Sequence, residues 1–425
     1  MGFFIIMFDS SYRPKILDSF QGYNLKTFLG DLSAGIVVAI IALPLSIALG
    51  IASGVGPNEG LYTAIVAGFV ISLFGGTKVQ ISGPTAALSG IIASAILEHG
   101  VNTMIVATIV AGVILILLGI FRIGAYLSKV PNTIVVGFTA GVALGLFVGQ
   151  LKDFFGSTYF VTASPFTNPN KFLTFIKNIN TINLQATLIG ILSLLIIIII
   201  PRLTKKIPPS LFAIFVSTIL VNKFNLNVLK IGDLYTISNS PMKLIHPNFI
   251  LLKSPSVYSL AITITILVGL EAILACKVSD KLSDDLHHSN AELIAQGLGN
   301  IASVLLGGIP ATAALARTST NVKNGAKTPI AGMIHAIVLF LTLIGLMKYV
   351  GMIPMPTIAA ILIVVSFNMS QFYAIKGYIK GGNIKDIAVI FTCLIFTFAL
   401  NLIAGISVSL LLWLIFNKGL IYEKK

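Results

Sequence analysis

The chain contains few charged side chains. Only 10% of its 425 residues are Asp, Glu, Lys or Arg, whereas 56% are hydrophobic and the mean hydropathy is +0.98. Charged residues make up about a quarter of a typical soluble domain, so this composition excludes a water-soluble globule. Repeated apolar runs of about 20 residues instead predict an all-α protein that crosses a lipid bilayer many times.

Cysteine is also scarce. The chain has only Cys276 and Cys393, which lie far apart in apolar stretches, so the sequence excludes a disulfide framework and offers no metal-ligand spacing. We predict that both pack as small apolar side chains. The phosphate-binding motif of ATPases is missing, which excludes ATP as the driving force. No motif indicates an enzyme, a cofactor or a bound metal.

Acidic residues are half as numerous as basic ones, with 14 Asp and Glu against 28 Lys and Arg and a formal net charge of +14. The basic residues are scattered among the loops, which argues against a nucleic-acid partner. When the amino terminus is placed in the cytoplasm, most of them fall in cytoplasmic segments, as the positive-inside rule requires. The sequence therefore predicts a protein of the bacterial inner membrane with both termini in the cytoplasm.

Fourteen membrane segments are predicted, seven in each half of the chain. In the first half they cover residues 31–52, 59–74, 84–97, 101–121, 131–150, 184–201 and 208–222, and in the second half 257–278, 290–306, 311–322, 328–347, 355–370, 386–401 and 404–418. They form a first repeat over 28–222 and a second over 257–418, with a cytoplasmic segment 1–27, an extracytoplasmic loop 223–256 and a cytoplasmic tail 419–425. Because seven is odd, the second repeat begins on the opposite side of the membrane and is inverted.

Two Ala-rich stretches, each containing a proline, interrupt the apolar pattern at matching places. They are Gly83-Pro84-Thr85-Ala86-Ala87-Leu88 and Ile309-Pro310-Ala311-Thr312-Ala313-Ala314-Leu315, and they follow the pairs Gly75-Gly76 and Gly307-Gly308. Two further matches, Pro131-Asn132-Thr133-Ile134 and Pro356-Thr357-Ile358, argue against chance recurrence of Ala-rich peptides. Interrupted segments at corresponding positions of two halves indicate the substrate site of a secondary transporter.

The prolines suggest how these interrupted segments fold. Proline suits the first turn of a helix, because its missing N–H group has no partner there. The preceding residues, 79–82 and 307–309, are predicted to be extended, which is tolerated at membrane depth only where they are buried or line a cavity. Two half-helices that begin near the midplane, in the third and tenth segments, would join two positive dipole ends into an anion site. The small residues there also suit tight helix packing, which is the alternative interpretation.

Glu271 in the eighth segment and Arg317 in the tenth are the ionisable residues that we predict to act inside the membrane, where such residues are usually functional. Arg317 would add a fixed positive charge beside the anion, and Glu271 would bind a proton or a cation. Alternatively, the two form a structural salt bridge. The neighbours on the face of Glu271, Leu267, Leu274 and Ala275, offer no oxygen ligand, which favours a proton over sodium.

A cytoplasmic loop after the eighth segment carries Asp284, Asp285, His287 and His288. Such a cluster suits a metal-binding or pH-sensing role. A solvated polar loop is the simpler interpretation and the one that we prefer.

Several longer motifs occur between residue 28 and about residue 415. They are Gly60-Leu61-Tyr62, Phe74-Gly75-Gly76-Thr77, Ile81-Ser82-Gly83-Pro84-Thr85-Ala86-Ala87, Gln150-Leu151-Lys152-Asp153-Phe154-Phe155-Gly156, Asn290-Ala291-Glu292-Leu293-Ile294-Ala295-Gln296-Gly297-Leu298-Gly299-Asn300 and Ala316-Arg317-Thr318-Ser319-Thr320-Asn321-Val322-Lys323-Asn324-Gly325-Ala326-Lys327-Thr328. Together they resemble the SulP anion transporters, or sulfate permeases. The resemblance implies a fourteen-segment fold shared with the uracil permeases, with core and gate domains that interleave both repeats. It also implies a homodimer and an elevator-like transport movement.

The resemblance further implies which residues surround the substrate. By position they are Leu45, Leu49, Thr85, Ala86, Ala87, Leu315, Ala316 and Arg317, with Glu271 as the coupling residue. Many members have Pro-Gln where this chain has Pro44-Leu45, so one polar contact to the substrate is expected to be absent. The Pro-Leu form with Ala-Arg in the tenth segment looks most like bacterial members that move dicarboxylates or bicarbonate. Family members usually continue into a soluble STAS domain, whereas this sequence ends at Lys425 and resembles the membrane domain.

The sequence therefore predicts a secondary active transporter that moves sulfate, a C4-dicarboxylate or bicarbonate together with a proton. One alternative is a sodium-coupled bicarbonate transporter. Another is a passive anion channel, which would need a continuous pore. A nucleobase permease of the same fold is disfavoured by Arg317, because polar or acidic side chains would be expected in both the eighth and the tenth segments. The identity of the anion stays open at this point.

Overall fold

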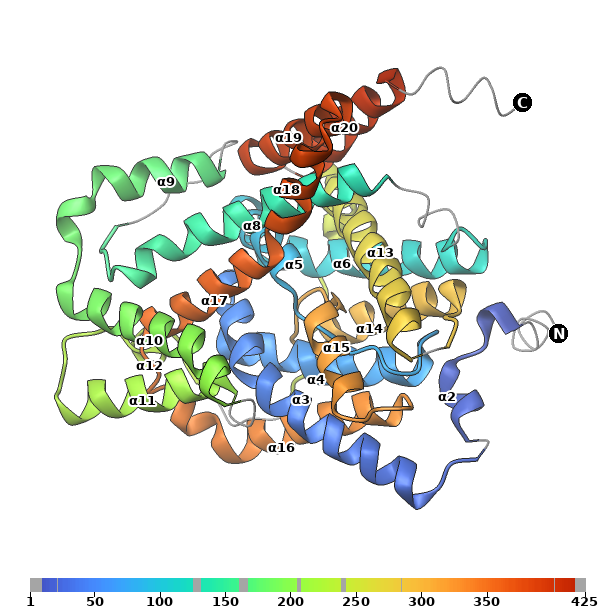
Figure 1. Cartoon of the computed structure of the whole chain (residues 1–425), viewed down its shortest axis with the longest axis horizontal. Helices are drawn as coiled ribbons and strands as arrows, with labels where there is room; N and C mark the ends of the chain where they lie inside the picture. Colours follow the sequence, from blue (N-terminus) through green and yellow to red (C-terminus); the bar gives the residue numbers. More distant parts are fainter. Residues whose placement is uncertain are drawn as a thin grey trace. The chain divides into compact units, whose positions relative to one another are not determined.

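The computed structural model describes residues 10–20, 22–124, 131–159, 167–204, 208–237, 242–283, 285–400 and 402–416 (Figure 1). Within these ranges the regular elements are helices, apart from one pair of two-residue strands. The predicted tail 419–425, the first nine residues and Asp284 lie outside the described residues. The all-α expectation is confirmed for the part of the chain that is described.

A helix lies at each of the ranges that were predicted to cross the membrane. Eight helical stretches in the described residues are long and apolar enough to span a bilayer, and several shorter apolar helices accompany them. The long stretches are α3 (Leu25–Ala52), α4 (Pro57–Phe74), α6 (Val101–Ile120), α8 (Asn132–Phe154), α10 (Leu184–Leu203), α13 (Pro255–Ser283), α16 (Ile330–Val350) and Met355–Gly381, which holds α17 (Met355–Met369) and α18 (Phe372–Gly381). The chain is thus an integral membrane protein, while the fourteen-segment count, the inverted repeat and the domain boundaries stay predictions.

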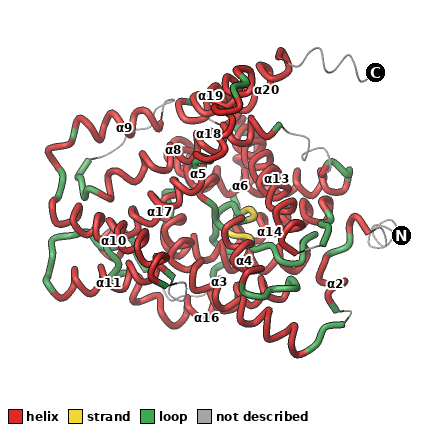
Figure 2. The backbone as a smooth tube through the Cα atoms, viewed as in Figure 1, coloured by secondary structure: helices red, strands yellow, loops and turns green. Residues whose placement is uncertain are grey.

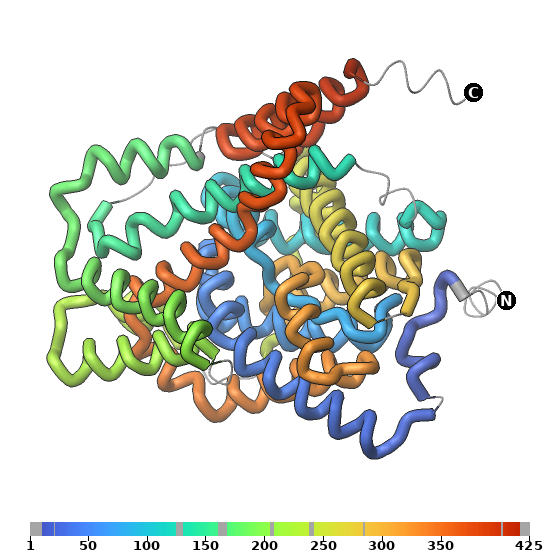
Figure 3. The backbone as a smooth tube through the Cα atoms, in the orientation of Figure 1, coloured from blue at the N-terminus to red at the C-terminus, as the bar shows by residue number. Residues whose placement is uncertain are grey.

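The chain folds into two compact units, each of which draws on both halves of the sequence. The first unit holds residues 1–129, 201–212 and 230–353. Besides α3, α4, α6, α13 and α16, it contains α2 (Lys15–Ser19), β1 (Ser82–Gly83), α5 (Ala86–His99), α12 (Ile231–Leu234), α14 (Ser289–Leu305), β2 (Thr312–Ala313) and α15 (Leu315–Lys323). Helix α14 packs against α4 and α6, and α16 packs against α3 and α4. Blue and orange segments therefore alternate in this unit (Figure 3).

Small residues bring the helices of the first unit close together. A methyl group added at Gly60 in α4 would collide with the Ser46 carbonyl oxygen of α3, and one at Gly112 in α6 would lie 2.8 Å from the Gly297 carbonyl oxygen of α14. In lipid the hydrophobic effect does not drive helices together. Close van der Waals packing over such small residues therefore stabilises the contact between neighbouring helices.

The second unit holds residues 130–200, 213–229 and 354–425. It contains α8, most of α10 and of α11 (Pro209–Lys223), α9 (Thr167–Lys177), α17, α18, α19 (Ile384–Ala399) and α20 (Leu402–Phe416), with α19 packed on α8 and α20. Inside it the Thr357 hydroxyl contacts Ser193 Oγ at 3.0 Å and donates to Ser217 Oγ at 2.8 Å. All three side chains are buried, so this chain of hydroxyl groups satisfies polar atoms that lipid could not.

Candidate functional site

The two Ala-rich stretches meet in the first unit as an antiparallel pair of strands. Ser82 lies opposite Ala313, and Gly83 lies opposite Thr312. Figure 2 shows the two strands in yellow among the surrounding helices. The Ala314 N–H group donates to the Ile81 carbonyl oxygen at 2.9 Å. Buried extended backbone needs partners for its polar groups, and each stretch supplies them to the other across more than two hundred residues of sequence.

Each strand leads directly into a helix whose amino terminus has no side-chain cap. Thr85 is the N-cap residue of α5 and Ala314 that of α15, and neither side chain accepts a hydrogen bond from the first turn. The first N–H groups of a helix have no intrahelical partner, and the dipole makes this end positive. Because both helices start within three residues of the strand pair, two such ends belong to one small region, which suits an anion.

Arg317 links the two half-helices. Its side chain is 2% exposed, and its Nη2 group donates to the Pro84 carbonyl oxygen, just before α5. Its Nε and Nη1 atoms have no hydrogen-bond partner among the described residues. A methyl group at Gly83 would lie 2.6 Å from Nη1, so glycine makes room for the guanidinium. A buried cation with two free donors is a second feature that suits an anion.

Glu271 lies beside the start of α5. The Thr85 hydroxyl group donates to Glu271 Oε2 at 3.2 Å, and the next residues of α13, Ala272 and Ala275, pack against Ala313 of β2. In the described structure Glu271 and Arg317 do not form the salt bridge that the sequence left open, because each contacts a different group. Thr85 also supplies a side-chain oxygen atom next to Glu271, whereas the sequence suggested only backbone carbonyl groups of the half-helices as oxygen ligands there.

The other predicted site residues lie on the same group of helices. Leu45 is partly buried and Leu49 is buried in α3, which contacts both α5 and α15. Ala86 and Ala87 are buried at the start of α5. Leu315 and Ala316 are exposed at the start of α15. All the predicted site residues therefore belong to the first unit, around the strand pair, and their role in binding stays a prediction.

Glu292 is a buried acidic residue that sequence reasoning missed. It is 0% exposed in α14 and accepts hydrogen bonds from Gly76 N at 3.0 Å, Gln80 Nε2 at 2.5 Å and Gln296 Nε2 at 2.8 Å. Three donors replace the water that the carboxylate loses. This network fixes the Gly-Gly turn and the residues before β1, so it positions the strand pair.

His335 is a second residue that sequence reasoning missed, although it lies inside the predicted segment 328–347. It is 0% exposed in α16, and neither ring nitrogen has a hydrogen-bond partner among the described residues. Its position as an ionisable residue within an apolar segment is the sequence feature that could have identified it. His335 therefore belongs with Glu271 and Arg317 as a functional candidate.

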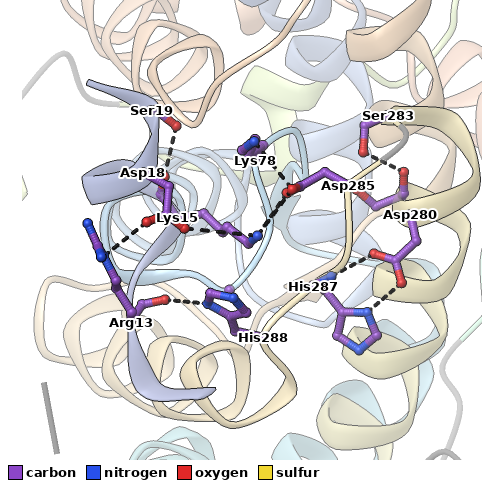
Figure 4. A network of polar contacts seen from close by, with 12 residues as sticks. Arg13, Lys15, Asp18, Ser19, Lys78, Asp280, Ser283, Asp285, His287 and His288 are labelled. Carbon is purple, nitrogen blue, oxygen red and sulfur yellow. Dashed lines mark hydrogen bonds and ion pairs between the residues drawn. The ribbon is translucent and has the colours of Figure 1, made fainter. Parts of the chain in front are cut away.

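The polar loop after α13 contacts the N-terminal segment (Figure 4). Asp285 pairs with Lys15 of α2 at 3.0 Å and with Lys78 at 3.3 Å. His288 Nδ1 lies 2.8 Å from the Arg13 carbonyl oxygen, and His287 Nδ1 lies 2.7 Å from Asp280 Oδ2. No group of three or more potential metal ligands occurs in the described ranges. These residues join α2, the turn after α4 and the start of α14 inside the first unit.

Comparison with known proteins assigns the family. Residues 28–393 match the sulfate permease family. The chain belongs to this family. It is 38% identical over 399 residues to the putative sulfate transporter YvdB of Bacillus subtilis (strain 168), covering 93% of this chain and 75% of that protein. It is 29% identical over 405 residues to the bicarbonate transporter BicA of Picosynechococcus, covering 91% of this chain and 69% of that protein. Its relatives are transporters, and the chain is an anion transporter of this family rather than an enzyme.

Solved structures agree with the fold. The transmembrane domain of a cyanobacterial bicarbonate transporter BicA superposes with a TM-score of 0.80 at 28% identity, covering 90% of this chain and 98% of that one. SLC26A9 superposes with a TM-score of 0.85 over 97% of this chain and 68% of that one, at 18% identity. The sulfate permease resemblance and the membrane assignment are therefore confirmed.

Proposed function

We propose that this protein is a secondary active transporter that moves a small anion together with a proton. The arrangement at the strand pair carries the proposal: two uncapped helix ends lie beside a buried arginine that has two free donors. Helix ends and guanidinium nitrogens favour negative charge without demanding one particular shape. The substrate is sulfate, a C4-dicarboxylate or bicarbonate, and the names of the relatives support the first and the last.

Glu271 is the proposed proton carrier. Its carboxylate lies next to Thr85, the N-cap residue of α5, where it would repel an arriving anion when ionised. Protonation removes this repulsion, so proton and anion bind more tightly together than either does alone. Such coupled binding is what a symporter needs.

Sodium coupling is the second candidate, and one observation favours it. The Thr85 hydroxyl oxygen and a Glu271 carboxylate oxygen lie 3.2 Å apart, and hard cations prefer several oxygen ligands. A sodium ion held there would neutralise Glu271 in place of a proton. The experiment below separates the two ions.

Uptake of labelled sulfate, succinate and bicarbonate into proteoliposomes tests the proposal under imposed proton or sodium gradients. The native chain is compared with Glu271→Gln, and Glu98→Gln serves as the control because Glu98 is an exposed carboxylate at the far end of α5. We expect proton-driven accumulation that saturates and that is lost only in Glu271→Gln. Accumulation driven by the sodium gradient would identify sodium, and not the proton, as the coupling ion. Flux that neither saturates nor follows a gradient would favour a passive channel.

The proposal includes an elevator-like movement, a homodimer and cytoplasmic termini. Light scattering of the purified protein measures its mass, and accessibility of a cysteine introduced near either terminus measures its side of the membrane. A monomer in detergent and in lipid nanodiscs would contradict the dimer, and periplasmic labelling would contradict the orientation.

A further inference from the structure

Arg317 and His335 flank the same short piece of buried backbone. A methyl group at Gly83 would lie 2.6 Å from Arg317 Nη1 and 3.4 Å from Ala64 Cα, and a methyl group at Gly68 would lie 3.2 Å from the Ser82 carbonyl oxygen and 3.8 Å from His335 Nδ1. Residues 64 and 68 are one turn apart on α4, which is about 5–6 Å. The guanidinium and the imidazole therefore lie near successive turns of α4, beside β1.

Both side chains keep polar atoms that no described residue satisfies. They are Nε and Nη1 of Arg317 and both ring nitrogens of His335, on side chains that are 2% and 0% exposed. Buried polar groups normally find partners, and leaving them without one is costly. Among the described side chains with such atoms, these two are the ionisable ones, which suits groups that are satisfied at another stage of the transport cycle.

Arg317 is the charged group that faces this region most directly. Glu292 of α14 is linked to β1 through Gln296, which donates to Glu292 Oε1 at 2.8 Å and to Ser82 Oγ at 3.4 Å. The segments 63–74 of α4, 32–52 of α3 and β1 carry no titratable side chain. Besides His335, α16 carries Lys348 and Tyr349, both in its last turn. Asp31 of α3 lies near the amino-terminal end of α16, where its carboxylate accepts a hydrogen bond from Thr328 N at 3.1 Å.

We propose that His335 is a second proton-binding group of the transport cycle, which takes up its proton when an anion binds at Arg317. This inference rests on the proposed anion site. Without an anion, the positive guanidinium opposes a second positive charge on the imidazole. An anion that pairs with Arg317 removes that repulsion, and the protonated imidazole then adds a second positive charge nearby. The effect is reciprocal, so the proton tightens anion binding by the same factor as the anion tightens proton binding.

Thermal stabilisation by sulfate measures this coupling without transport. The apparent dissociation constant is determined at pH 6 and pH 8 in a Glu271→Gln protein, which removes the contribution of that carboxylate. We expect about tenfold weaker binding at pH 8, within the range usual for coupled sites. Adding His335→Gln should abolish the pH dependence. Adding His246→Gln, the control at an exposed histidine of the same unit, should preserve it. Bicarbonate is a second probe at pH 8 only, because it is largely converted to carbon dioxide at pH 6.

Nitrogen NMR of histidine-labelled native protein gives a readout that does not depend on folding of the His335 variant. The chain has five histidines, so the His335 signal is assigned by elimination with His→Gln variants at the other four positions. We expect a neutral ring without sulfate and a rising imidazolium fraction as sulfate is added.

The outcomes separate this inference from the proposed function. If neither anion stabilises the protein at any pH, the anion site fails and the inference fails with it. If an anion stabilises the protein equally at pH 6 and pH 8 in the Glu271→Gln background, or if the His335 ring keeps its protonation state when the anion binds, the anion site stands and His335 is only a packing residue.

Discussion

Replacing Gly83 by alanine moves the Arg317 guanidinium without changing any charge. The added methyl group would lie 2.6 Å from Arg317 Nη1 and 3.4 Å from Ala64 Cα. The backbone of α4 is held by its helix, whereas the end of an arginine side chain is flexible, so the arginine is expected to move. Its hydrogen bond to the Pro84 carbonyl oxygen, which places the guanidinium at the start of α5, would then break.

The magnitude follows from the strength of one charge-assisted contact. A hydrogen bond from a charged group contributes about 1.5–3 kcal/mol, and a displaced guanidinium loses a contact of this kind with the anion. Because about 1.4 kcal/mol corresponds to a factor of ten, we expect the half-saturation concentration of the anion to rise roughly tenfold to a hundredfold. The maximal rate should change less, since the coupling residue Glu271 is untouched.

Initial rates of labelled anion uptake into proteoliposomes measure both quantities. Gly90→Ala is the matched control, because Gly90 lies in α5, shortly after Gly83, but has open space around it. It should leave the half-saturation concentration within about twofold of the native value, because the added methyl group meets no neighbouring atom. A folded Gly83→Ala protein with native half-saturation would refute the reasoning, because the position of the guanidinium would then not set anion affinity.

Three further substitutions test individual contacts. Thr85→Val removes the donor to Glu271 and should lower proton-driven accumulation several-fold, whereas Thr85→Ser should retain it; equal accumulation in both would show that the hydroxyl is dispensable. Glu292→Gln replaces one of the two acceptor oxygens by an NH2 donor, so at least one buried donor loses its acceptor. It should destabilise the first unit by about 1–3 kcal/mol, seen as a lower unfolding temperature in detergent. Gly60→Ala forces α3 and α4 apart and should lower that temperature, whereas Gly345→Ala, which meets open space, should not; an unchanged temperature for Gly60→Ala would contradict the close packing.

The helices were the predictable part of this protein. Long apolar runs that alternate with Gly, Pro and charged residues place a helix at each of the fourteen predicted ranges, because lipid permits few structures other than helices. The short helices α2, α9, α12 and α18 were not predicted. The non-helical residues before each half-helix were also expected from the prolines. The expectation that 307–309 is extended is wrong at Gly307, which lies in a turn with φ +86°. The pairing of the two strands was not expected, since no sequence pattern states that two strands of two residues each will meet.

The contacts around the site were harder to predict, for a physical reason. The guanidinium of Arg317 reaches the Pro84 carbonyl oxygen and Thr85 reaches Glu271, and each contact joins helices that lie far apart in the sequence. Glu292 sits at the predicted edge of a segment, where an acidic residue usually faces water, yet three donors make its burial possible. His335 was missed although its place inside an apolar segment was visible.

The candidate site lies within the first unit alone, and this limits the ways in which the protein can transport its substrate. Leu45, Thr85, Glu271 and Arg317 all lie in the first unit. Alternating access would require either that this unit opens internally or that it moves as a whole. Internal opening would separate the paired strands and break the Glu292 network and the Arg317–Pro84 bond, leaving several buried polar groups unsatisfied at a cost of about 1–3 kcal/mol each. Movement of the intact unit avoids that cost, so these contacts favour an elevator-like mechanism over a pore that opens through the unit.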